Sequence, residues 1–363
     1  MSDFYPIVQN FQFDGKFLRA EPYGFGHIND TYAAYFEKPN GDTYRYILQR
    51  INHKVFRNPP QLMKNIEQVT NHLRKKIITT GGDPDRETLN LILTTSGDIY
   101  FRDFNENYWR AYIFIEGAET YQVAASMQHV QNAGHAFGNF QRLLSDFPAA
   151  QLSETIPDFH NTPQRLTDFK AALDADTLNR AHLAKNEIEF VLNRESDMPV
   201  LIHHAADLTV RVTHNDTKFN NVMIDDQTGE GVCIIDLDTV MPGLSLYDFG
   251  DAIRSISNTA AEDERDLSTV NFSLTTFEYF TTGFLTATRG ILTPKEVDLL
   301  PFSAKLMTLE CGMRFLADYL EGDVYFKVHR AEHNLDRCRT QFKLVQEMEA
   351  QTEEMVQIIE KYN

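Results

Sequence analysis

Strand-like and helix-like patterns are divided unevenly along this 363-residue sequence, and that division is the strongest restriction on its fold. Up to about residue 115 the apolar residues alternate or run as they do in strands, with an Asn40-Gly41 turn signal between the first two runs. One segment, 59–76, instead begins with prolines and continues with an apolar stripe at helical spacing. We therefore expect a small domain built around an antiparallel sheet with one helix. The strand candidates are 31–36, 43–51, 89–95 and 108–115.

After Gly117 the spacing of apolar residues becomes helical. Strand patterns return only between about 208 and 236, where the turn 225–231 separates two short runs as in a hairpin. We expect an α+β protein with a β-rich domain at 1–115 and a mainly helical domain at 116–363. The expected helices of the second domain are 128–147, 162–175, 180–192, most of 260–320, and one long helix at 339–362.

The charge balance limits the partners of the chain. It carries 34 Lys and Arg against 52 Asp and Glu, a net charge of −18. Nucleic acid and anionic membranes repel such a chain, so neither is an expected partner, whereas cationic substrates are favoured. Three widely spaced cysteines argue against a disulfide framework and a zinc knuckle. The N-terminus has no secretory signal pattern and no stretch reaches membrane-spanning length, so we expect a cytoplasmic protein.

The strand cluster carries the chemistry. The segment VTHNDTKFNNVMIDD packs His214, Asp216, Lys218 and Asn221 into eight positions. Folding the hairpin brings Asn221 beside Asp236, because facing residues of a hairpin lie about 5 Å apart. One carboxylate and one amide oxygen suit Mg²⁺, which keeps water and substrate phosphates as its other ligands. In the alternative interpretation His214, Asp216 and Asn221 are ordinary turn formers; the hairpin and the β-rich first domain favour the metal site.

HNDTKFNN resembles the catalytic loop of the protein-kinase-like superfamily, H-x-D-x-x-x-x-N, and IIDLD stands in the place of its metal-binding D-F-G segment. The resemblance implies a bilobal fold in which Asp216 orients the accepting hydroxyl and takes its proton. Asn221 and Asp236 would hold Mg²⁺, and Lys218 would balance charge on the transferred phosphoryl group. A later segment, YDFGDAIR, comes too late for the D-F-G role. We interpret its Asp248 as a helix-entry carboxylate that braces the loop or has a purely structural role.

The same resemblance assigns ATP contacts to the first domain. PYGFGHINDTY, with Gly24 and Gly26, lies where kinases carry their phosphate-covering loop, although two glycines alone often mean only a turn. The connector between the domains would bind adenine through its backbone. Its residues are Phe114, Ile115 and Glu116.

The strand lysine of kinases has no counterpart here. Its position falls within YILQR, which offers Gln49 followed by Arg50. Glu67, on the expected helix 59–76, is the candidate partner for a basic residue at this place. Either Arg50 substitutes for the lysine, or the ATP phosphates are held without that ion pair.

The lack of an A-P-E-type segment after Asp236 argues against a protein kinase, and DTVMPGLSLYDFGDAIR resembles the aminoglycoside phosphotransferase branch instead. Within that branch, long runs over nearly the whole chain resemble the N-acetylhexosamine 1-kinases. This implies phosphorylation of the anomeric 1-hydroxyl of N-acetylglucosamine or N-acetylgalactosamine by MgATP. The sugar contacts implied by the resemblance are His27, Asp216, Arg314 and Tyr325.

Two other functions stay open at this stage. The first is a kinase of the same fold for a cationic small molecule such as choline or an aminoglycoside, which the net charge favours. The second is a binding module that retains the fold without catalysis. Gln49 in place of the lysine favours it, and the presence of Asp216, Asn221 and Asp236 argues against it.

Overall fold

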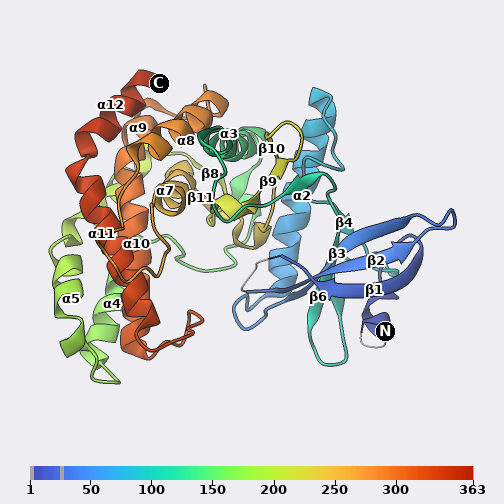
Figure 1. The fold of residues 1–363 in the computed structure, drawn as a ribbon, viewed down its shortest axis with the longest axis horizontal. Coiled ribbons are helices and arrows are strands. Elements are labelled where there is room, and N and C mark those ends of the chain that lie inside the picture. The colour runs from blue at the N-terminus through green and yellow to red at the C-terminus, as the bar shows by residue number, and fades with distance from the viewer. Residues whose placement is uncertain (1–3, 25–27, 363) are drawn as a thin grey trace.

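The computed structural model describes residues 4–24 and 28–362. Its N-terminal part is a six-stranded antiparallel sheet in the order β1-β2-β3-β6-β4, with β5 paired to β6 as well. A short helix, α1 (Tyr5–Val8), precedes the sheet, which Figure 1 draws in blue and cyan. The strands are β1 (Lys16–Pro22), β2 (Asp30–Glu37), β3 (Thr43–Ile51), β4 (Leu91–Ile92), β5 (Phe101–Arg102) and β6 (Tyr108–Ile113).

The two faces of this sheet have different neighbours. Alternation along β6 sends Trp109 and Ala111 to an outer core with α1, whereas Tyr112 joins the core beneath the long helix α2 (Pro59–Thr80). Asn58 caps α2 by accepting a hydrogen bond from the backbone of Gln61 at 3.3 Å, and a left-handed Gly81 ends it. In Figure 1, α2 stands between the sheet and the C-terminal helices. The predicted helix 59–76 is therefore present and one turn longer.

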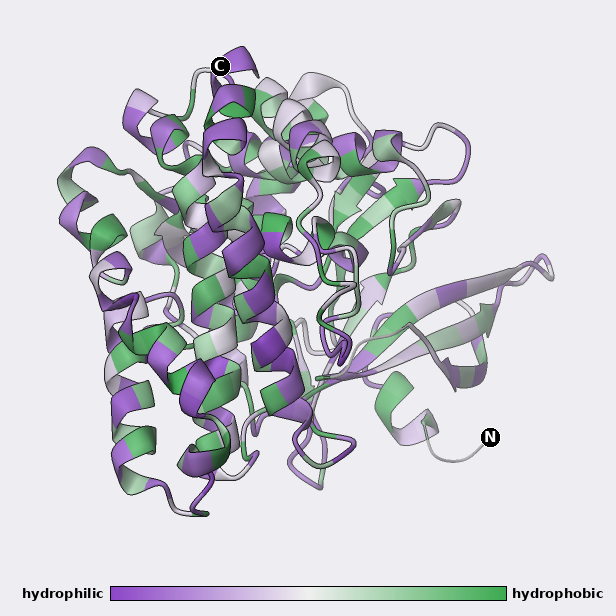
Figure 2. Ribbon diagram, turned by 60° about the vertical axis from the view of Figure 1, so that its left-hand side comes forward, coloured by the Kyte–Doolittle hydropathy of each residue, from purple (hydrophilic) through white to green (hydrophobic). Residues whose placement is uncertain are grey.

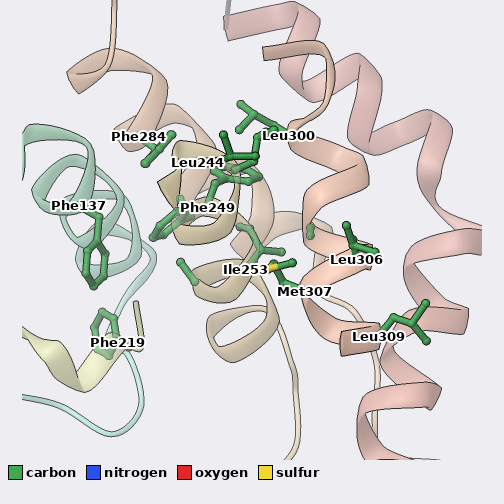
Figure 3. Close-up of a cluster of buried hydrophobic side chains, with 14 of the residues drawn as sticks. Phe137, Phe219, Leu244, Phe249, Ile253, Phe284, Leu300, Leu306, Met307 and Leu309 are labelled. Carbon is green, nitrogen blue, oxygen red and sulfur yellow. The ribbon is translucent and has the colours of Figure 1, made fainter. Parts of the chain in front are cut away.

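The C-terminal part is mainly helical, as the sequence predicts. Phe249 of α7 packs against Phe284 of α8 with ring centroids 5.3 Å apart, and Figure 3 shows α7 between Phe284 and Met307 of α10. The helices are α3 (Met127–Leu143), α4 (Thr162–Ala175), α5 (Lys185–Leu192), α6 (Val200–His203), α7 (Ser245–Ile256), α8 (Leu274–Ala287), α9 (Pro294–Asp298), α10 (Leu300–Glu321), α11 (His333–Ala350) and α12 (Thr352–Tyr362).

Two small sheets carry the loops of the C-terminal part. The predicted hairpin is present as β9 (Val222–Asp225) paired antiparallel with β10 (Gly231–Ile234), and β7 (Ala118–Glu119) adds a third strand directly after the connector. A second pair joins β8 (Val210–Thr213) to β11 (Met241–Leu244). The two pairs hold the loops 214–221 and 235–240 next to each other, because these loops leave adjacent strand ends.

Three expectations about elements were wrong. The single long helix 339–362 is two helices, since Gln351 leaves the helical conformation with ψ 21° and separates α11 from α12. The strand candidate 89–95 shrinks to the two residues of β4. Four described strands had not been predicted: β1 is half-exposed and carries three charged residues, β11 contains a proline and a glycine, and β5 and β7 have only two residues each.

The closest helix contact, between α3 and α8, depends on glycine. A Cβ atom on Gly134 would lie 2.2 Å from the carbonyl oxygen of Phe280, and one on Gly283 would lie 2.0 Å from that of Gln131. The two backbones can therefore approach only without side chains at these positions. Figure 2 shows hydrophobic and hydrophilic residues sharing the surfaces of the C-terminal helices, which is typical of helices with one buried side. Among the described helices, none is long and apolar enough to cross a membrane.

Candidate active site

Two carboxylates of α7 hold the loop that begins at His214. Asp248 is buried and accepts hydrogen bonds from the backbone amides of His214 at 3.0 Å and Asn215 at 2.8 Å, and from the Gln141 side chain at 2.8 Å. One turn later Asp251 accepts from the amide of Thr217 at 2.9 Å. Burial raises the pKa of Asp248, and its hydrogen bonds and His214 oppose that rise. Of the two roles considered for Asp248, the brace is the one that the structure shows.

The loop is tied to the segment after β10 as well. Asn215 adopts a left-handed conformation with φ 63° and donates a hydrogen bond to the carbonyl oxygen of Thr239 at 2.8 Å. In return the Thr239 hydroxyl donates to the carbonyl oxygen of His214 at 2.7 Å. The His214 ring contacts the carbonyl oxygen of Ile235 through Nε2 at 2.8 Å. Since a carbonyl only accepts, Nε2 carries the proton and donates. The two loops therefore form one hydrogen-bonded unit.

Asp216, Lys218 and Asn221 converge on that unit. The Lys218 ammonium lies 2.9 Å from one Asp216 oxygen, and the Asn221 amide nitrogen donates to the other at 3.3 Å and to the Asp216 carbonyl at 2.8 Å. The Asp216 charge raises the pKa of Lys218 above its usual range, so the ammonium stays protonated. Because the amide nitrogen of Asn221 is occupied, its side-chain oxygen is left to accept from, or coordinate, a ligand.

Asp236 lies on the other loop, beside the Asn221 end of the hairpin. The amide of Ile235 donates to the carbonyl oxygen of Asn221 at 2.9 Å, which continues the hairpin register to the residue just before Asp236. Asp236 has a left-handed backbone with φ 58° and a solvent-accessible side chain. Although the side chain is open to solvent, neighbouring protein removes part of its hydration; this, and then the negative charges of Asp238 and Asp216, raise the pKa of Asp236 to about 6. Asp216 and Asp238 have ion-pair partners in Lys218 and Arg110. Among the described residues Asp236 forms no ion pair, so its carboxylate is the one left to bind a cation.

The donor set fits a hard divalent ion better than a soft one. The described residues contain no cluster of three or more His, Cys, Asp or Glu placed to hold a metal. They do offer the free amide oxygen of Asn221 and the carboxylate of Asp236, oxygen ligands of the kind that Mg²⁺ takes when phosphates and water complete its shell. These residues therefore fit Mg²⁺ held jointly with a phosphate ligand.

The position of the kinase strand lysine is part of a polar row. Gln49 donates to the Thr31 hydroxyl at 2.8 Å and accepts from Nε of Arg110 at 2.9 Å. Arg110 also forms a buried ion pair with Asp238, two residues after Asp236. Sequence reasoning missed both members of this pair. The available signal was that Arg110 is the only basic residue within the apolar run 108–115.

Arg50 and Glu67 do not form the expected pair. Arg50 lies on the outer face of the sheet and donates to Asp30 through Nε at 2.8 Å, because adjacent strand residues point to opposite faces. Glu67 accepts from Lys64 of its own helix at 2.7 Å. Arg50 therefore does not take the place of the strand lysine, and of the two alternatives the one without that ion pair agrees with the structure.

The connector is fixed by arginines from the N-terminal part. Phe114 and Ile115 are buried, and Arg45 stacks on the Phe114 ring at 3.8 Å while it pairs with Glu116 at 2.6 Å. Arg86 donates to the carbonyl oxygen of Gly117 at 2.9 Å and to the Asp225 side chain at 2.7 Å. A small apolar cluster lies beside this connector. Its members are Ile115, Ala118, Met223 and Cys233.

The structure describes only some of the residues predicted for the glycine loop and the sugar site. Gly24 has φ 78° and open space on its Cβ side, as a phosphate-covering loop requires, whereas Gly26 and His27 lie outside the described residues. Arg314 of α10 and Tyr325 are brought together, with the guanidinium carbon 5.9 Å from the Tyr325 ring centroid. The rings of Phe159 and Phe326 lie 4.8 and 5.7 Å from it. A surface arginine paired with an acidic side chain would be the ordinary role for Arg314, but within the described residues it forms no ion pair.

Arg314 lies one turn after Cys311 on α10, a helix that packs against α7. Burial raises the pKa of Cys311, one turn earlier, to about 11, and Arg254 and Arg314 both oppose that rise. Arg254 is the ion-pair partner of Asp251 at 2.8 Å, and Asp251 holds Thr217. The helix that carries Arg314 thus packs against the helix that carries Asp248 and Asp251.

Comparison with known proteins agrees with this geometry. A family model described as the phosphotransferase enzyme family, APH, matches residues 19–272, which is more than half of the chain. The chain belongs to this family. It has the bilobal kinase-like fold of the family, and membership makes it an ATP-dependent small-molecule kinase.

Solved structures share the fold at low identity. An aminoglycoside phosphotransferase from Alicyclobacillus acidocaldarius superposes with TM-score 0.61 and 12% identity over 96% of this chain and 95% of that one. A choline kinase from Cryptosporidium parvum has TM-score 0.56 and 13% identity over 100% and 96% of the two chains. A microcompartment-associated aminopropanol kinase has TM-score 0.55 and 14% identity over 93% of each chain.

Proposed function

We propose that this kinase transfers the terminal phosphoryl group of MgATP to the anomeric 1-hydroxyl of an N-acetylhexosamine, GlcNAc or GalNAc. The products are the sugar 1-phosphate and ADP. The observation that carries the proposal is that Asn221 and Lys218 contact the Asp216 carboxylate, while the hydrogen bond from Ile235 to Asn221 brings the loop of Asp236 beside them. The long resemblance to the N-acetylhexosamine 1-kinases supports the sugar as acceptor.

Asn221 and Asp236 would hold Mg²⁺ together with the ATP phosphates. The bound ion supplies neutralisation of phosphate charge, the main requirement of a loose transition state. The connector backbone at Phe114–Glu116 would bind adenine, and the cluster of Ile115, Met223 and Cys233 offers an apolar surface for its ring. Gly24 would let the first loop approach the phosphates.

Asp216 would orient the sugar hydroxyl and accept its proton. The anomeric hydroxyl is more acidic than an ordinary alcohol, so a carboxylate is a sufficient base. Lys218, which already contacts Asp216, would stabilise the negative charge on the phosphoryl group during its transfer. Much of the rate would come from holding these groups in position, which the hydrogen bonds that the loop amides donate to Asp248 and Asp251 support.

The surface around Arg314 favours a neutral acceptor over a cationic one. Arg165 and Arg314 lie close enough that burial and then the Arg314 charge lower the pKa of Arg165. Two neighbouring guanidinium groups repel choline or an aminoglycoside, while guanidinium donors and aromatic rings suit sugar hydroxyls and a sugar ring. Charges next to a bound acceptor act on it more strongly than the net charge of −18, because that charge is spread over the whole molecule and screened by salt.

An ADP-release assay with a panel of acceptors tests the proposal. We expect Mg²⁺-dependent turnover with GlcNAc or GalNAc and none with choline, homoserine or aminoglycosides. The product is expected to release phosphate readily in mild acid, because an anomeric phosphate hydrolyses faster there than a primary one. Turnover confined to the cationic acceptors would replace the sugar assignment. A protein that binds nucleotide but turns over none of the panel would favour the binding module.

A further inference from the structure

A row of polar side chains crosses the inner face of the N-terminal sheet and ends on the loop that carries Asp236. Thr31, Gln49 and Arg110 are register partners on β2, β3 and β6, so their side chains lie side by side on one face. Hydrogen bonds of 2.8 and 2.9 Å join them in that order. The terminal nitrogen Nη1 of Arg110 then reaches one oxygen of Asp238.

Asp238 belongs to the C-terminal part, but the side-chain partners of its carboxylate come from the N-terminal part. Its second oxygen accepts a hydrogen bond from the Asn29 side chain at 2.6 Å, and Asn29 in turn accepts from the backbone of Asn52 at 3.0 Å. Both carboxylate oxygens are thereby occupied by side chains from the sheet. Because Asp238 lies two residues after Asp236, the sheet fixes the loop at the point where it presents the candidate metal ligand.

The burial of this pair indicates a role beyond stability. Arg110 is 1% exposed and Asp238 is 3% exposed. Taking two charges out of water is expensive, and replacing such pairs by apolar side chains is often neutral or stabilising. The neighbouring Gln49, where kinases carry a lysine, brings no charge. The positive charge beside the metal loop is therefore supplied from the adjacent strand.

We propose that Arg110 is a positioning residue for the metal loop: through Asp238 it fixes Asp236 against the N-terminal sheet and takes the part of the missing strand lysine. This inference rests on the metal role proposed for Asp236. Its mechanism differs from that of the kinase lysine, which contacts phosphates directly. The Arg110 side chain is enclosed by Gln49, Met63 and Asp238, so it acts through the loop and not on the nucleotide.

Nucleotide affinity with and without the ion tests this mechanism. Calorimetry with AMP-PNP in Mg²⁺ and in EDTA is expected to show that Arg110→Met weakens the Mg²⁺ complex about 10- to 100-fold, as for lost partners of metal ligands. Binding in EDTA should stay close to the wild type. Equal losses in both conditions would put Arg110 on the phosphates, and no loss would make it a stability element; either result overturns the proposal.

The same titration separates this inference from the proposed function. It needs no acceptor, so a wrong sugar assignment leaves its result unchanged. If the wild-type protein bound AMP-PNP equally well with Mg²⁺ and with EDTA, the metal role of Asn221 and Asp236 would fail instead.

A double variant separates positioning from folding. Arg110→Met alone leaves the Asp238 carboxylate buried without its partner, which lowers the stability of the protein. Adding Asp238→Asn removes that charge and keeps an oxygen for Asn29. We expect the free energy of unfolding to recover in the double variant while the Mg²⁺-dependent affinity stays low. Recovery of both together would show a purely structural pair. Arg110→Lys keeps the positive charge but lacks the planar guanidinium group. The Mg²⁺-dependent affinity of this variant for AMP-PNP should therefore fall between those of the wild type and Arg110→Met.

Arg211→Met is the matched control. Arg211 of β8 and Glu296 of α9 form another buried arginine–carboxylate pair, 8% and 1% exposed. This variant should lose stability as Arg110→Met does and keep the Mg²⁺-dependent affinity of the wild type. An equal loss of that affinity would attribute the effect of Arg110 to general destabilisation and overturn the proposal.

Discussion

The two sides of the candidate active site are assembled differently. On the C-terminal side, Asp216, Lys218 and Asn221 follow one another within six positions, and one hairpin returns Asp236 to them. On the N-terminal side, the groups that meet come from different strands and are joined by sheet register, as Gln49 and Arg110 are. In the local motif the functional residues can be read directly from their order in the sequence. In the sheet, residues of different strands lie side by side, so the positive charge can come from Arg110 on β6 when β3 carries Gln49.

The largest effect is expected from a substitution in the local motif on the C-terminal side. Asp216→Asn removes the base and keeps an oxygen for the Asn221 amide, so kcat should fall about 10²- to 10⁴-fold. The free energy of unfolding should change by less than about 1 kcal/mol, since the side chain is partly exposed. Steady-state kinetics and denaturant unfolding measure both. Asp226→Asn, an exposed aspartate in the same hairpin turn, is the control and should behave as wild type. Near-normal turnover in Asp216→Asn would remove Asp216 from the mechanism.

Asp248→Asn sharpens the comparison by loosening the loop without touching the reacting groups. An amide has one oxygen where the carboxylate uses two, so the hydrogen bonds to His214, Asn215 and Gln141 cannot all be kept. We expect a loss of stability of about 1–3 kcal/mol. Displacement of the loop should lower kcat up to about 100-fold. Thermal unfolding and kcat are the measurements, and a destabilised enzyme with unchanged kcat would limit Asp248 to a structural role.

Arg314→Met tests the proposed acceptor surface on α10, which is built neither by the catalytic-loop motif nor by the register of the N-terminal sheet. Removing the guanidinium is expected to raise the KM for the sugar about 10- to 100-fold, the value of a hydrogen bond to a charged group, with the KM for MgATP unchanged. Arg289→Met, at an exposed position of the loop after α8, is the control. If the KM for MgATP rose and that for the sugar did not, Arg314 would belong to the nucleotide side.

The smallest effect is expected at the connector. Glu116→Gln breaks an exposed ion pair with Arg45, which is worth about 0–1 kcal/mol. Adenine would contact the backbone there and not the Glu116 side chain. The KM for MgATP should therefore change by less than about threefold, which corresponds to an energy in the lower half of that range. Arg86→Met should have the larger effect, because Arg86 donates to the connector backbone itself. The reverse order would show that side chains of the connector bind the nucleotide.

Much of the fold could be predicted because its signals are local. The helix 162–175 has the predicted bounds, since Asn161 caps its start and its periodicity is regular. The β9–β10 hairpin follows from its turn residues. The break at Gln351 could not be predicted, because no proline or glycine marks it and the periodicity continues on both sides. Edge strand β1 was missed because its charged residues hide the alternation.

In the candidate site too, contacts between residues close in sequence could be predicted and contacts between distant residues could not. The convergence of Asn221 and Asp236 was predictable from one hairpin, which relates residues close in sequence. The partner of Arg110 was not, since Asp238 lies 128 residues away and only the packing of the two parts brings it near. Arg50 was misplaced for a related reason: the sequence does not say which face of a strand meets the cleft, and one residue of offset reverses the direction of the side chain.

The end of α10 has a consequence for substrate range. Asp318 accepts hydrogen bonds from the backbone amides of Val324 at 2.9 Å, Tyr325 at 2.7 Å and Phe326 at 3.0 Å. The segment that carries Tyr325 is thus anchored by its backbone to the helix that carries Arg314, and its outward side chains are free to vary. Val324 and Tyr325 are more than half exposed. With the acceptor role proposed for Tyr325, a graft of this short segment from a related kinase is expected to change acceptor preference while α10 and the residues proposed for phosphoryl transfer stay intact.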